Sequence, residues 1–396
     1  MANREVVIID GARTAIGKFG GGVKDLTAPQ MCAEAAKAAM QRSGVKPDQI
    51  DEVVIGHARQ AGAGPNTSRQ VAIRAGLPVS VPALTLQQAC VAGMQAIIVA
   101  TQRILLGDAD VVLAGGMEHM SSIPFLAVDQ RWGVRLGDAR LLDAMYKDGY
   151  ICAIENRHMG ELTDALAKRY GISREEQDQY AYESQMGAAA GKAEGLAAKM
   201  IVPIEIPQPK GQVFVFQEDE HPRPDTTLEK LAKLPPAFGK DGTITAGNAS
   251  GITDGAAAMI VAAKTKADEL GLKPLAYVRS YATAAVAPAD FGIAPVLSNQ
   301  KALAKIGKTV RDMDLIEVNE AFAAQVLAVM KDQDIPRSKM NVYGGAISLG
   351  HPTGMSGARI VLQLIYALRE KGGRWGLAGI CGNGGHGGSV VVEMAQ

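Results

Sequence analysis

Two cysteines and a histidine stand at turns that follow expected strands. Cys90, in QQACVAGMQAII, precedes an expected helix, where unpaired backbone N–H groups and the helix dipole favour a thiolate and lower its pKa. His351 lies in GGAISLGHPTGMSGAR, a glycine-rich turn before another helix, and suits an orienting base and a donor to an oxyanion. Cys381 follows a strand in GICGNGGHGGS, where six glycines from Gly379 to Gly388 leave backbone N–H groups open to a ligand.

These residues together indicate covalent catalysis, with one thiol as nucleophile, the histidine as its activator and the other thiol as acid or base. A cysteine nucleophile suits thioester exchange, because the acyl-enzyme and a thioester substrate are close in energy. Each residue alone also fits a plainer role, since a free cysteine is most often a small buried apolar residue. A loop histidine is most often exposed, and we expect His386, in the same loop as Cys381, to be structural or solvated.

Strands that alternate with helices predict a mainly parallel, buried α/β sheet that would position these residues. The opening strand is expected to end at the Asp10-Gly11 turn. The expected strands of the first third are 4–10, 51–58, 83–88 and 108–116, and the expected helices are 28–43, 66–75 and 93–106.

The last third repeats the first. Residues 340–373 are expected to form a strand, a glycine-rich turn and a helix, and residues 374–394 a strand, a turn and a strand, as residues 84–120 do. A repeat of this length indicates two similar domains that face each other. Between them, proline-rich stretches and the charged helix SREEQDQYAYESQ interrupt the alternation of strands and helices.

We therefore expect three domains. The N-terminal half comprises residues 1–119 and 249–270, the C-terminal half comprises 271–396, and residues 120–248 form a loop domain over the active site.

Composition excludes several classes of protein. The 396 residues are 47 % apolar and 21 % charged, which is not the composition of a disordered chain. Lys+Arg and Asp+Glu both number 41, so we expect no nucleic-acid partner of the kind that strongly basic proteins bind. The four cysteines form no C-x-x-C pair, which argues against a disulfide framework and a structural zinc site. No signal peptide or membrane span is expected, and the prediction is a soluble cytoplasmic protein with reduced thiols.

Six motifs in order resemble those of the thiolases: CVAGMQA, GGMEHMS, TAGNASGITDGAAA, VNEAFAAQ, GGAISLGHPTGMSGAR and CGNGGHG. The resemblance extends from about residue 4 to residue 395. It implies the thiolase fold, an α/β architecture with two βαβαβαββ halves in five αβαβα layers and an inserted loop domain that covers the active site and the CoA site.

The resemblance also implies catalytic roles. Cys90 matches the acylated nucleophile, and His351 matches the histidine that activates it and contributes to an oxyanion hole. Cys381 matches the acid/base, and Asn319 matches the residue that holds a water completing that hole. The backbone N–H groups of Cys90 and Asn383 would form a second oxyanion hole.

Six further residues match positions that contact the CoA thioester in the family. They are Ser250 and the pair Ala321 and Phe322 beside the pantetheine, the pair His158 and Met159 at the acyl pocket of short-chain members, and Arg223 near the adenine.

Three positions depart from the family pattern. Ala92 stands where a serine is usual, Asn383 replaces a glycine, and Phe291 lies where short-chain members often carry methionine. The side chain of Asn383 needs room and a partner, and Phe291 bears on the choice of acyl group.

The resemblance implies an acyl-CoA C-acyltransferase that condenses two acetyl-CoA to acetoacetyl-CoA and CoA. It implies CoA thioesters as substrates, no metal or redox cofactor, and a homodimer or homotetramer. One alternative is a 3-ketoacyl-CoA thiolase for longer or unusual acyl chains. Another is a non-catalytic CoA-binding or complex-forming subunit, which should have lost a reactive cysteine or the histidine. A decarboxylating condensing enzyme of the ketoacyl-synthase type should carry a second histidine in place of Cys381.

Overall fold

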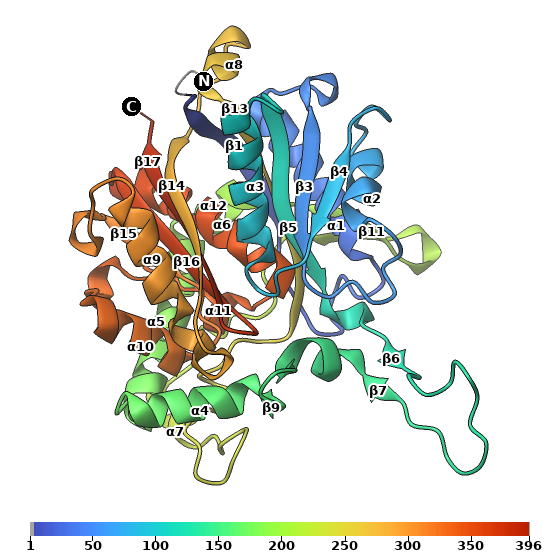
Figure 1. Ribbon diagram of the computed structural model, residues 1–396, viewed down its shortest axis with the longest axis vertical. Helices are drawn as coiled ribbons and strands as arrows, with labels where there is room; N and C mark the ends of the chain where they lie inside the picture. Colours follow the sequence, from blue (N-terminus) through green and yellow to red (C-terminus); the bar gives the residue numbers. More distant parts are fainter. Residues whose placement is uncertain (1–3, 396) are drawn as a thin grey trace.

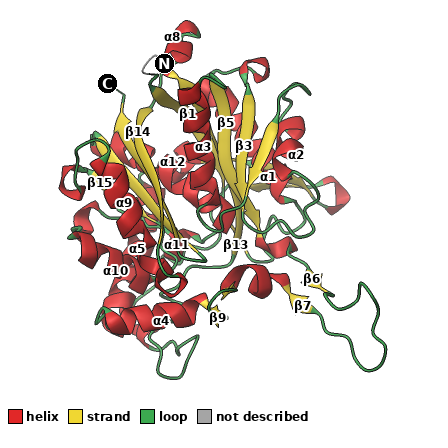
Figure 2. Ribbon diagram, in the orientation of Figure 1, coloured by secondary structure: helices red, strands yellow, loops and turns green. Residues whose placement is uncertain are grey.

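The computed structural model describes residues 4–395, and one mixed sheet of eleven strands forms its core (Figure 1, Figure 2). The N-terminal part contains β1 (Val6–Thr14), β2 (Gly17–Lys18), β3 (Glu52–His57), β4 (Ala83–Leu86), β5 (Val111–His119), β10 (Ile201–Val202) and β13 (Thr253–Ala263). The C-terminal part contains β14 (Ala276–Ala285), β15 (Leu315–Val318), β16 (Trp375–Gly382) and β17 (His386–Met394). The strand order is β15-β16-β17-β14-β1-β13-β5-β3-β4, with β10 beside β1 and β2 beside β13.

The two parts of the sheet are almost separate. Only two residue pairs, Val7 with Tyr277 and Ile8 with Ala276, join β1 to β14. The N-terminal part contains the parallel neighbours β4, β3 and β5, and the C-terminal part contains the parallel pair β15 and β16. The carboxyl ends of β4, β3 and β5 therefore lie along one edge of the sheet.

Helices form the other three layers. The central layer contains α3 (Ala92–Leu106) and α12 (Thr353–Lys371), which contact each other and strands of both parts of the sheet. On the outer faces, α1 (Ala28–Ser43) and α2 (Thr67–Arg74) cover the N-terminal part, and α9 (Ala294–Ala304) covers the C-terminal part beside α10 (Ala323–Gln333) (Figure 1). The predicted α/β class, with duplicated halves in five αβαβα layers, is confirmed. The expectation of a mainly parallel sheet was wrong, because most neighbouring strands, such as β13 with β5 and β14 with β17, are antiparallel.

Glycines let the two central helices meet at their N-terminal ends. A Cβ on Gly93 would lie 2.6 Å from the carbonyl oxygen of Gly354, and a Cβ on Gly357 would lie 2.3 Å from the backbone nitrogen of Met94. No side chain fits such distances, so only glycine permits this approach. The turns that precede these two helices, and with them Cys90 and His351, are brought together in this way.

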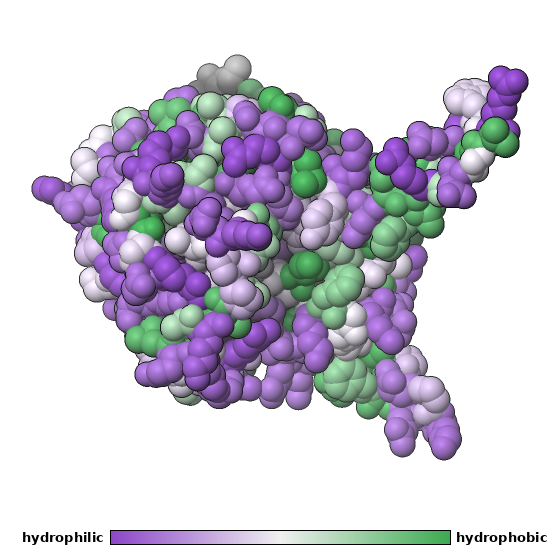
Figure 3. All heavy atoms as spheres, turned by 90° about the horizontal axis from the view of Figure 1, so that it is seen from below, coloured by the Kyte–Doolittle hydropathy of each residue, from purple (hydrophilic) through white to green (hydrophobic). Residues whose placement is uncertain are grey.

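Residues 120–248 contribute mostly short elements outside the large sheet. They are β6 (Phe125–Leu126), β7 (Leu142–Asp143), β8 (Ile151–Cys152), β9 (Arg157–His158), α4 (Met159–Arg169), α5 (Arg174–Ala193), α6 (Leu196–Met200), β11 (Ile204–Pro207), β12 (Val213–Phe216) and α7 (Leu228–Ala232). The helices α4 and α5 pack on α10. Between β6 and β7 the chain forms an arm that extends away from the body of the protein (Figure 1, Figure 3). Two short helices, α8 (Lys264–Glu269) and α11 (Ala346–Leu349), complete the structure.

Two expectations about local structure were wrong. The opening strand does not end at Asp10-Gly11 but continues to Thr14 through an irregularity in register between Ile8 and Gly11, because its backbone pairs with β13 on both sides of that point. The strand expected from residue 340 is reduced to a single bridge between Met340 and Ile316, since the chain turns at once toward α11.

One buried helix has the length and hydropathy of a membrane span. Residues 89–106 do reach the length and hydropathy of a membrane span, but 56 % of this window is buried inside the protein. The window coincides with α3, whose apolar surface packs between the two parts of the sheet.

Candidate active site

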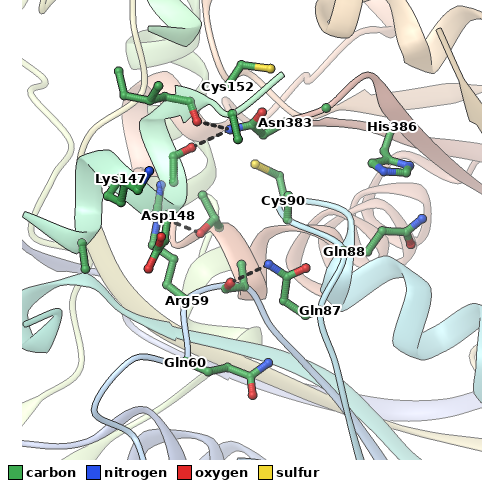
Figure 4. A pocket seen from close by; sticks show the side chains of 18 of the residues that line it. Arg59, Gln60, Gln87, Gln88, Cys90, Lys147, Asp148, Cys152, Asn383 and His386 are labelled. Carbon is green, nitrogen blue, oxygen red and sulfur yellow. Dashed lines mark hydrogen bonds between the residues drawn. The ribbon is translucent and has the colours of Figure 1, made fainter. Parts of the chain in front are cut away.

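Cys90 lies in a tight turn at the sheet edge, four residues after β4 and two residues before α3. Ala89 has a φ of 47°, in the left-handed region that side chains rarely adopt, so the chain turns sharply at the nucleophile position. Cys90 is partly exposed to a cavity of about 900 Å³, whose lining includes Arg59, Thr353 and Asn383 (Figure 4). The thiol is thus presented to a space large enough for a substrate.

His351 is held in one orientation and one tautomer. Ser356 Oγ donates to the carbonyl oxygen of Pro352 at 3.0 Å, so at 2.6 Å from His351 Nδ1 it accepts the Nδ1 proton. Nε2 is therefore the unprotonated nitrogen, and its lone pair accepts from Asn319 Nδ2 at 3.3 Å. Burial, with the charges of Arg59 and Arg359, lowers the pKa of His351 from 6.5 to about 3. The imidazole is neutral at physiological pH and can act as a base.

We expect Ser356→Ala to lower kcat/KM about 3- to 10-fold, because a lost neutral hydrogen bond costs about 0.5–1.5 kcal/mol and each 1.36 kcal/mol is tenfold in rate. The measurement is kcat/KM across pH. Ser280→Ala is the matched control, since Ser280 is also buried and donates to a carbonyl, that of Ala302, away from the site. An unchanged kcat/KM in Ser356→Ala would show that the serine does not orient the imidazole.

The buried neutral histidine also makes stability depend on pH. Between about pH 6.5 and pH 3 the unfolded chain binds a proton at His351 that the folded chain does not, so stability falls as pH falls through this window. We expect about 2 kcal/mol of unfolding free energy to be lost at His351 between pH 7 and pH 5. Urea unfolding of the wild type and of His351→Asn at both pH values measures it, and an equal loss in both proteins would contradict the prediction.

Cys381, near the end of β16, is 2 % exposed and packs in an apolar cluster with Met159, Phe291 and Phe322. Burial raises the pKa of its thiol well above the ordinary value, and the nearby Cys90 adds to this effect. The second thiol is therefore protonated at rest and lies close enough to the first to interact with it.

The prediction that the Cys90 pKa is lowered was wrong for the resting site. Burial raises the pKa of Cys90 to about 11, and Arg59 and the backbone N–H groups of Asn383 and Cys90 oppose this only in part. The helix dipole has little effect on the Cys90 pKa because α3 begins two residues later, at Ala92. The free energy of removing a thiolate from water exceeds the stabilisation that Arg59 and the backbone N–H groups provide. At neutral pH the nucleophile is a thiol that needs a base.

Asn383 finds both the room and the partners that its side chain needs. Its Nδ2 donates to the carbonyl oxygens of Gly149 at 2.9 Å and Ile151 at 3.2 Å, which ties the glycine-rich loop to the segment before β8 (Figure 4). With the side chain turned this way, its backbone N–H faces the Cys90 thiol. The departure from glycine thus leaves this donor in place. Ala92, the other departure beside the nucleophile, is buried.

Asn319 follows β15, and its backbone N–H donates to Gly379 at 3.0 Å. Its Oδ1 is buried and has no hydrogen-bond partner among residues 4–395, as an amide that holds a water would require.

The residues that follow Asn319 form a wall. Ala321 accepts from the backbone N–H of Ser250 at 3.1 Å, and Phe322 pairs with Ala249. The same 248–251 segment reaches the histidine, because Gly251 accepts from the backbone N–H of His351 at 3.2 Å.

The other expected substrate residues lie at two places. His158 caps α4, accepts from the backbone N–H of Gly160 at 3.0 Å and stacks on Phe238, with ring centres 4.5 Å apart. Burial lowers the pKa of His158, and Met159 beside it shares the apolar cluster of Cys381 and Phe291. Arg223 is exposed, on a segment that its backbone N–H joins to Gln185 at 2.8 Å. Of the predicted site residues, only Cys90 and Asn383 line the cavity of about 900 Å³.

Sequence reasoning missed Ser356, Arg59 and Glu118. Ser356 lies five residues after His351, where the first turn of a helix returns toward it, so helical geometry could have found it. Glu118 stands in the GGMEHMS motif, and Arg59 follows the strand between those of Cys90 and Glu118, so parallel strand order could have found both. Among residues 4–395, no three His, Cys, Asp or Glu side chains are grouped so that they could hold a metal ion.

Comparison with known proteins agrees with this arrangement. Residues 6–265 match the family "Thiolase, N-terminal domain", and residues 272–394 match "Thiolase, C-terminal domain". The chain is 48 % identical over 389 residues to an acetyl-CoA acetyltransferase of Chromobacterium violaceum and 47 % identical over 389 residues to one of Cupriavidus necator, covering 98 % of this chain and 99 % of each relative.

Two solved structures are also similar to this chain over nearly its whole length. The acetyl-CoA acetyltransferase of Bacillus anthracis superposes with a TM-score of 0.97 at 43 % identity over the whole of both chains. Human mitochondrial 3-ketoacyl-CoA thiolase in complex with CoA gives a TM-score of 0.95 at 41 % identity, covering 99 % of this chain and 98 % of that one. With both domain families matched and relatives this similar over nearly its full length, the chain belongs to the thiolase family.

Proposed function

We propose that this protein is an acetyl-CoA C-acetyltransferase, which reversibly condenses two acetyl-CoA to acetoacetyl-CoA and CoA through an acetyl-cysteine. Three observations carry the proposal. Cys381 lies close enough to Cys90 to interact with it, the approach of Gly93 to Gly354 brings the turns of Cys90 and His351 together, and His351 is neutral with Nε2 unprotonated. The relatives named acetyl-CoA acetyltransferase, at 46–48 % identity, support acetyl-CoA as the substrate rather than a longer 3-ketoacyl-CoA.

In the first half-reaction, Cys90 gives its proton to His351 Nε2, and its sulfur attacks the carbonyl carbon of acetyl-CoA. The bond from that carbon to the CoA sulfur breaks, and the departing CoA thiolate takes the proton of Cys381. Acetyl-Cys90, a Cys381 thiolate and a positively charged His351 remain. A thiolate buried as Cys381 is becomes a strong base, because burial raises the pKa of its thiol.

In the second half-reaction, the Cys381 thiolate removes an α-proton from a second acetyl-CoA. The resulting enolate forms a carbon–carbon bond with the acetyl carbon, and the bond from that carbon to Cys90 breaks. The Cys90 sulfur recovers its proton from His351, so both thiols and the neutral imidazole are regenerated. No group other than the CoA thioesters and the side chains of the chain enters these steps.

Two oxyanion holes would stabilise the negative charge. The backbone N–H groups of Cys90 and Asn383 would hold the oxygen of the acetyl thioester, and each such donor is typically worth about 2.7–4 kcal/mol. His351 Nε2–H and a water on Asn319 Oδ1 would hold the enolate oxygen. The unpartnered Oδ1 supports this assignment.

CoA would lie along the wall formed by Ser250, Ala321 and Phe322, with its adenine near the exposed Arg223. The acetyl group would meet His158, Met159 and Phe291, whose apolar surroundings support a small acyl group. The loop domain 120–248, set between the halves 1–119 plus 249–270 and 271–396, would thus supply part of both sites.

We infer a cytoplasmic homodimer or homotetramer. All four cysteines are free, as in a reducing compartment. On the arm between β6 and β7, Trp132 and Leu136 are each 94 % exposed, an apolar surface that a second copy would cover.

The test is condensation of acetyl-CoA by the purified protein, with mass spectrometry of the protein after incubation with acetyl-CoA. We expect acetoacetyl-CoA and one acetyl group on Cys90. Absence of both would overturn the proposed function and favour a non-catalytic CoA-binding subunit. A much higher thiolysis rate for long 3-ketoacyl-CoAs than for acetoacetyl-CoA would overturn the substrate.

A further inference from the structure

Two buried residues of opposite charge, Arg59 and Glu118, lie at the sheet edge behind the nucleophile. The parallel strands β4, β3 and β5 are neighbours, and their carboxyl ends lead to Cys90, Arg59 and Glu118. The strand order therefore places Arg59 between Cys90 and Glu118 along this edge of the sheet. No step of the proposed reaction uses this pair.

Arg59 is buried, with 7 % of its surface exposed, and its contacts hold the side chain in place. Its Nη1 donates to Thr353 Oγ1 at 3.2 Å, and its Cζ lies 4.5 Å from the ring centre of Tyr150. A Cβ on Gly149 would lie 2.1 Å from Arg59 Nε, so this neighbour must be glycine for the guanidinium to occupy its place. The guanidinium of Arg59 is therefore held at one position in the site.

Glu118 supplies the negative partner. It is fully buried and accepts from the backbone N–H of Arg59 at 3.2 Å, from Gly354 N–H at 3.1 Å and from Thr353 Oγ1. Burial raises the pKa of Glu118, but His57, which lies 3.3 Å away, together with Arg59 and Thr353, outweighs burial and holds that pKa below its ordinary value. The carboxylate is therefore charged.

We propose that Arg59 is a positioning residue that stabilises the thiolate form of Cys90 by its fixed positive charge. Arg59 and Cys90 line the same cavity (Figure 4), and Arg59 is the strongest of the groups that oppose the effect of burial on Cys90, whereas Glu118 acts in the other direction. Because Arg59 donates to Thr353, two residues after His351, its charge also disfavours the protonated imidazole. The inference rests on the proposed function, in which Cys90 must become an anion.

Several other titratable groups surround Cys90 and bear on any measurement of its ionisation. They are Glu118 at the end of β5, Lys147, Asp148 and Tyr150 in the segment 146–150, His351 before α12, Cys381 on β16 and His386 on β17. Of these, Lys147 is a cation on the same cavity wall but is exposed, so it provides a matched control for Arg59.

The test is the rate of alkylation of Cys90 by iodoacetamide as a function of pH, followed by mass spectrometry on the full-length protein. In Arg59→Met we expect the midpoint of the profile to rise by about one pH unit. Arg59→Lys should restore most of the wild-type midpoint, and Lys147→Met should leave it unchanged. A wild-type midpoint in Arg59→Met, or an equal shift in Lys147→Met, would overturn the proposal.

Glu118→Gln provides a second measurement if Arg59→Met does not fold. Loss of the negative charge should lower the midpoint, and a rise would overturn the proposal. Alkylation needs no substrate, so the result is independent of turnover. If acetyl-CoA fails to acetylate Cys90 but Arg59→Met still raises the midpoint of alkylation, the proposed function is wrong. The effect of Arg59 on the ionisation of Cys90 would still be supported.

Discussion

Replacing Cys90 by alanine is expected to abolish acetylation of the protein and to lower kcat for condensation by at least about 10⁴-fold, the scale of losses when the nucleophile of a covalent mechanism is removed. The reason is that no other group can accept the acetyl group in the same place. Burial raises the pKa of the Cys381 thiol even more than that of Cys90, so its sulfur is the poorer nucleophile. Mass spectrometry after exposure to acetyl-CoA and a condensation assay measure the two effects.

Cys32→Ala is the matched control for this variant. Cys32 is fully buried in α1, on the outer face of the sheet, and should contribute only to packing. Its removal should leave both acetylation and condensation close to wild type. Acetylation of the Cys90→Ala protein at another residue, with condensation retained, would mean that the nucleophile is elsewhere.

Replacing Cys381 by alanine is expected to separate the two half-reactions. Acetyl-Cys90 should still form, because a CoA thiolate leaves without strong acid assistance, and it should accumulate because no base removes the α-proton of the second acetyl-CoA. Condensation should fall by about 10²–10⁴-fold, the usual contribution of general acid–base catalysis. Rapid-quench mass spectrometry for the acetyl-enzyme and a steady-state assay for acetoacetyl-CoA measure the two results.

Cys381→Ser is the comparison for that prediction. The hydroxyl is slightly smaller and more polar than the thiol and ionises far less readily, so condensation should remain low while the fold is unchanged. If Cys381→Ser condensed acetyl-CoA at the wild-type rate, the side chain would position the substrate rather than transfer a proton. If Cys381→Ala failed to form acetyl-Cys90, the thiol would be needed in the first half-reaction as more than a proton donor to CoA.

Local patterns predicted most of the fold correctly. The apolar run of β5 and the apolar face of α1, which ends at Gly44 with a φ of 76°, are local signals, because the period of a strand or helix and a left-handed stop are set by adjacent residues. The expected strand from residue 340 failed for the converse reason. Its apolar residues are buried by tertiary packing rather than by a place in the sheet, and only Met340 pairs with a strand.

The candidate site shows the same difference between features that local sequence predicts and features that depend on tertiary packing. The positions of Cys90, His351 and Cys381 before or after their elements could be predicted, since strand–turn–helix order is local. Ser356, which fixes the histidine, and the buried charges of Arg59 and Glu118 were missed, because their contacts depend on how turns and strands are placed in space.

By itself, the sequence determined which reactive side chains the protein has, the turns that present them, the duplication of its halves and, through six ordered motifs, its family. Only the tertiary structure decided their protonation. Cys90 was expected to ionise readily, yet burial raises its pKa to about 11 and lowers that of His351 to about 3. A pKa depends on the solvent excluded and the charges gathered around a group from every direction, and residues distant in the chain, such as Arg59 and Glu118 around Cys90, supply them only once the chain has folded.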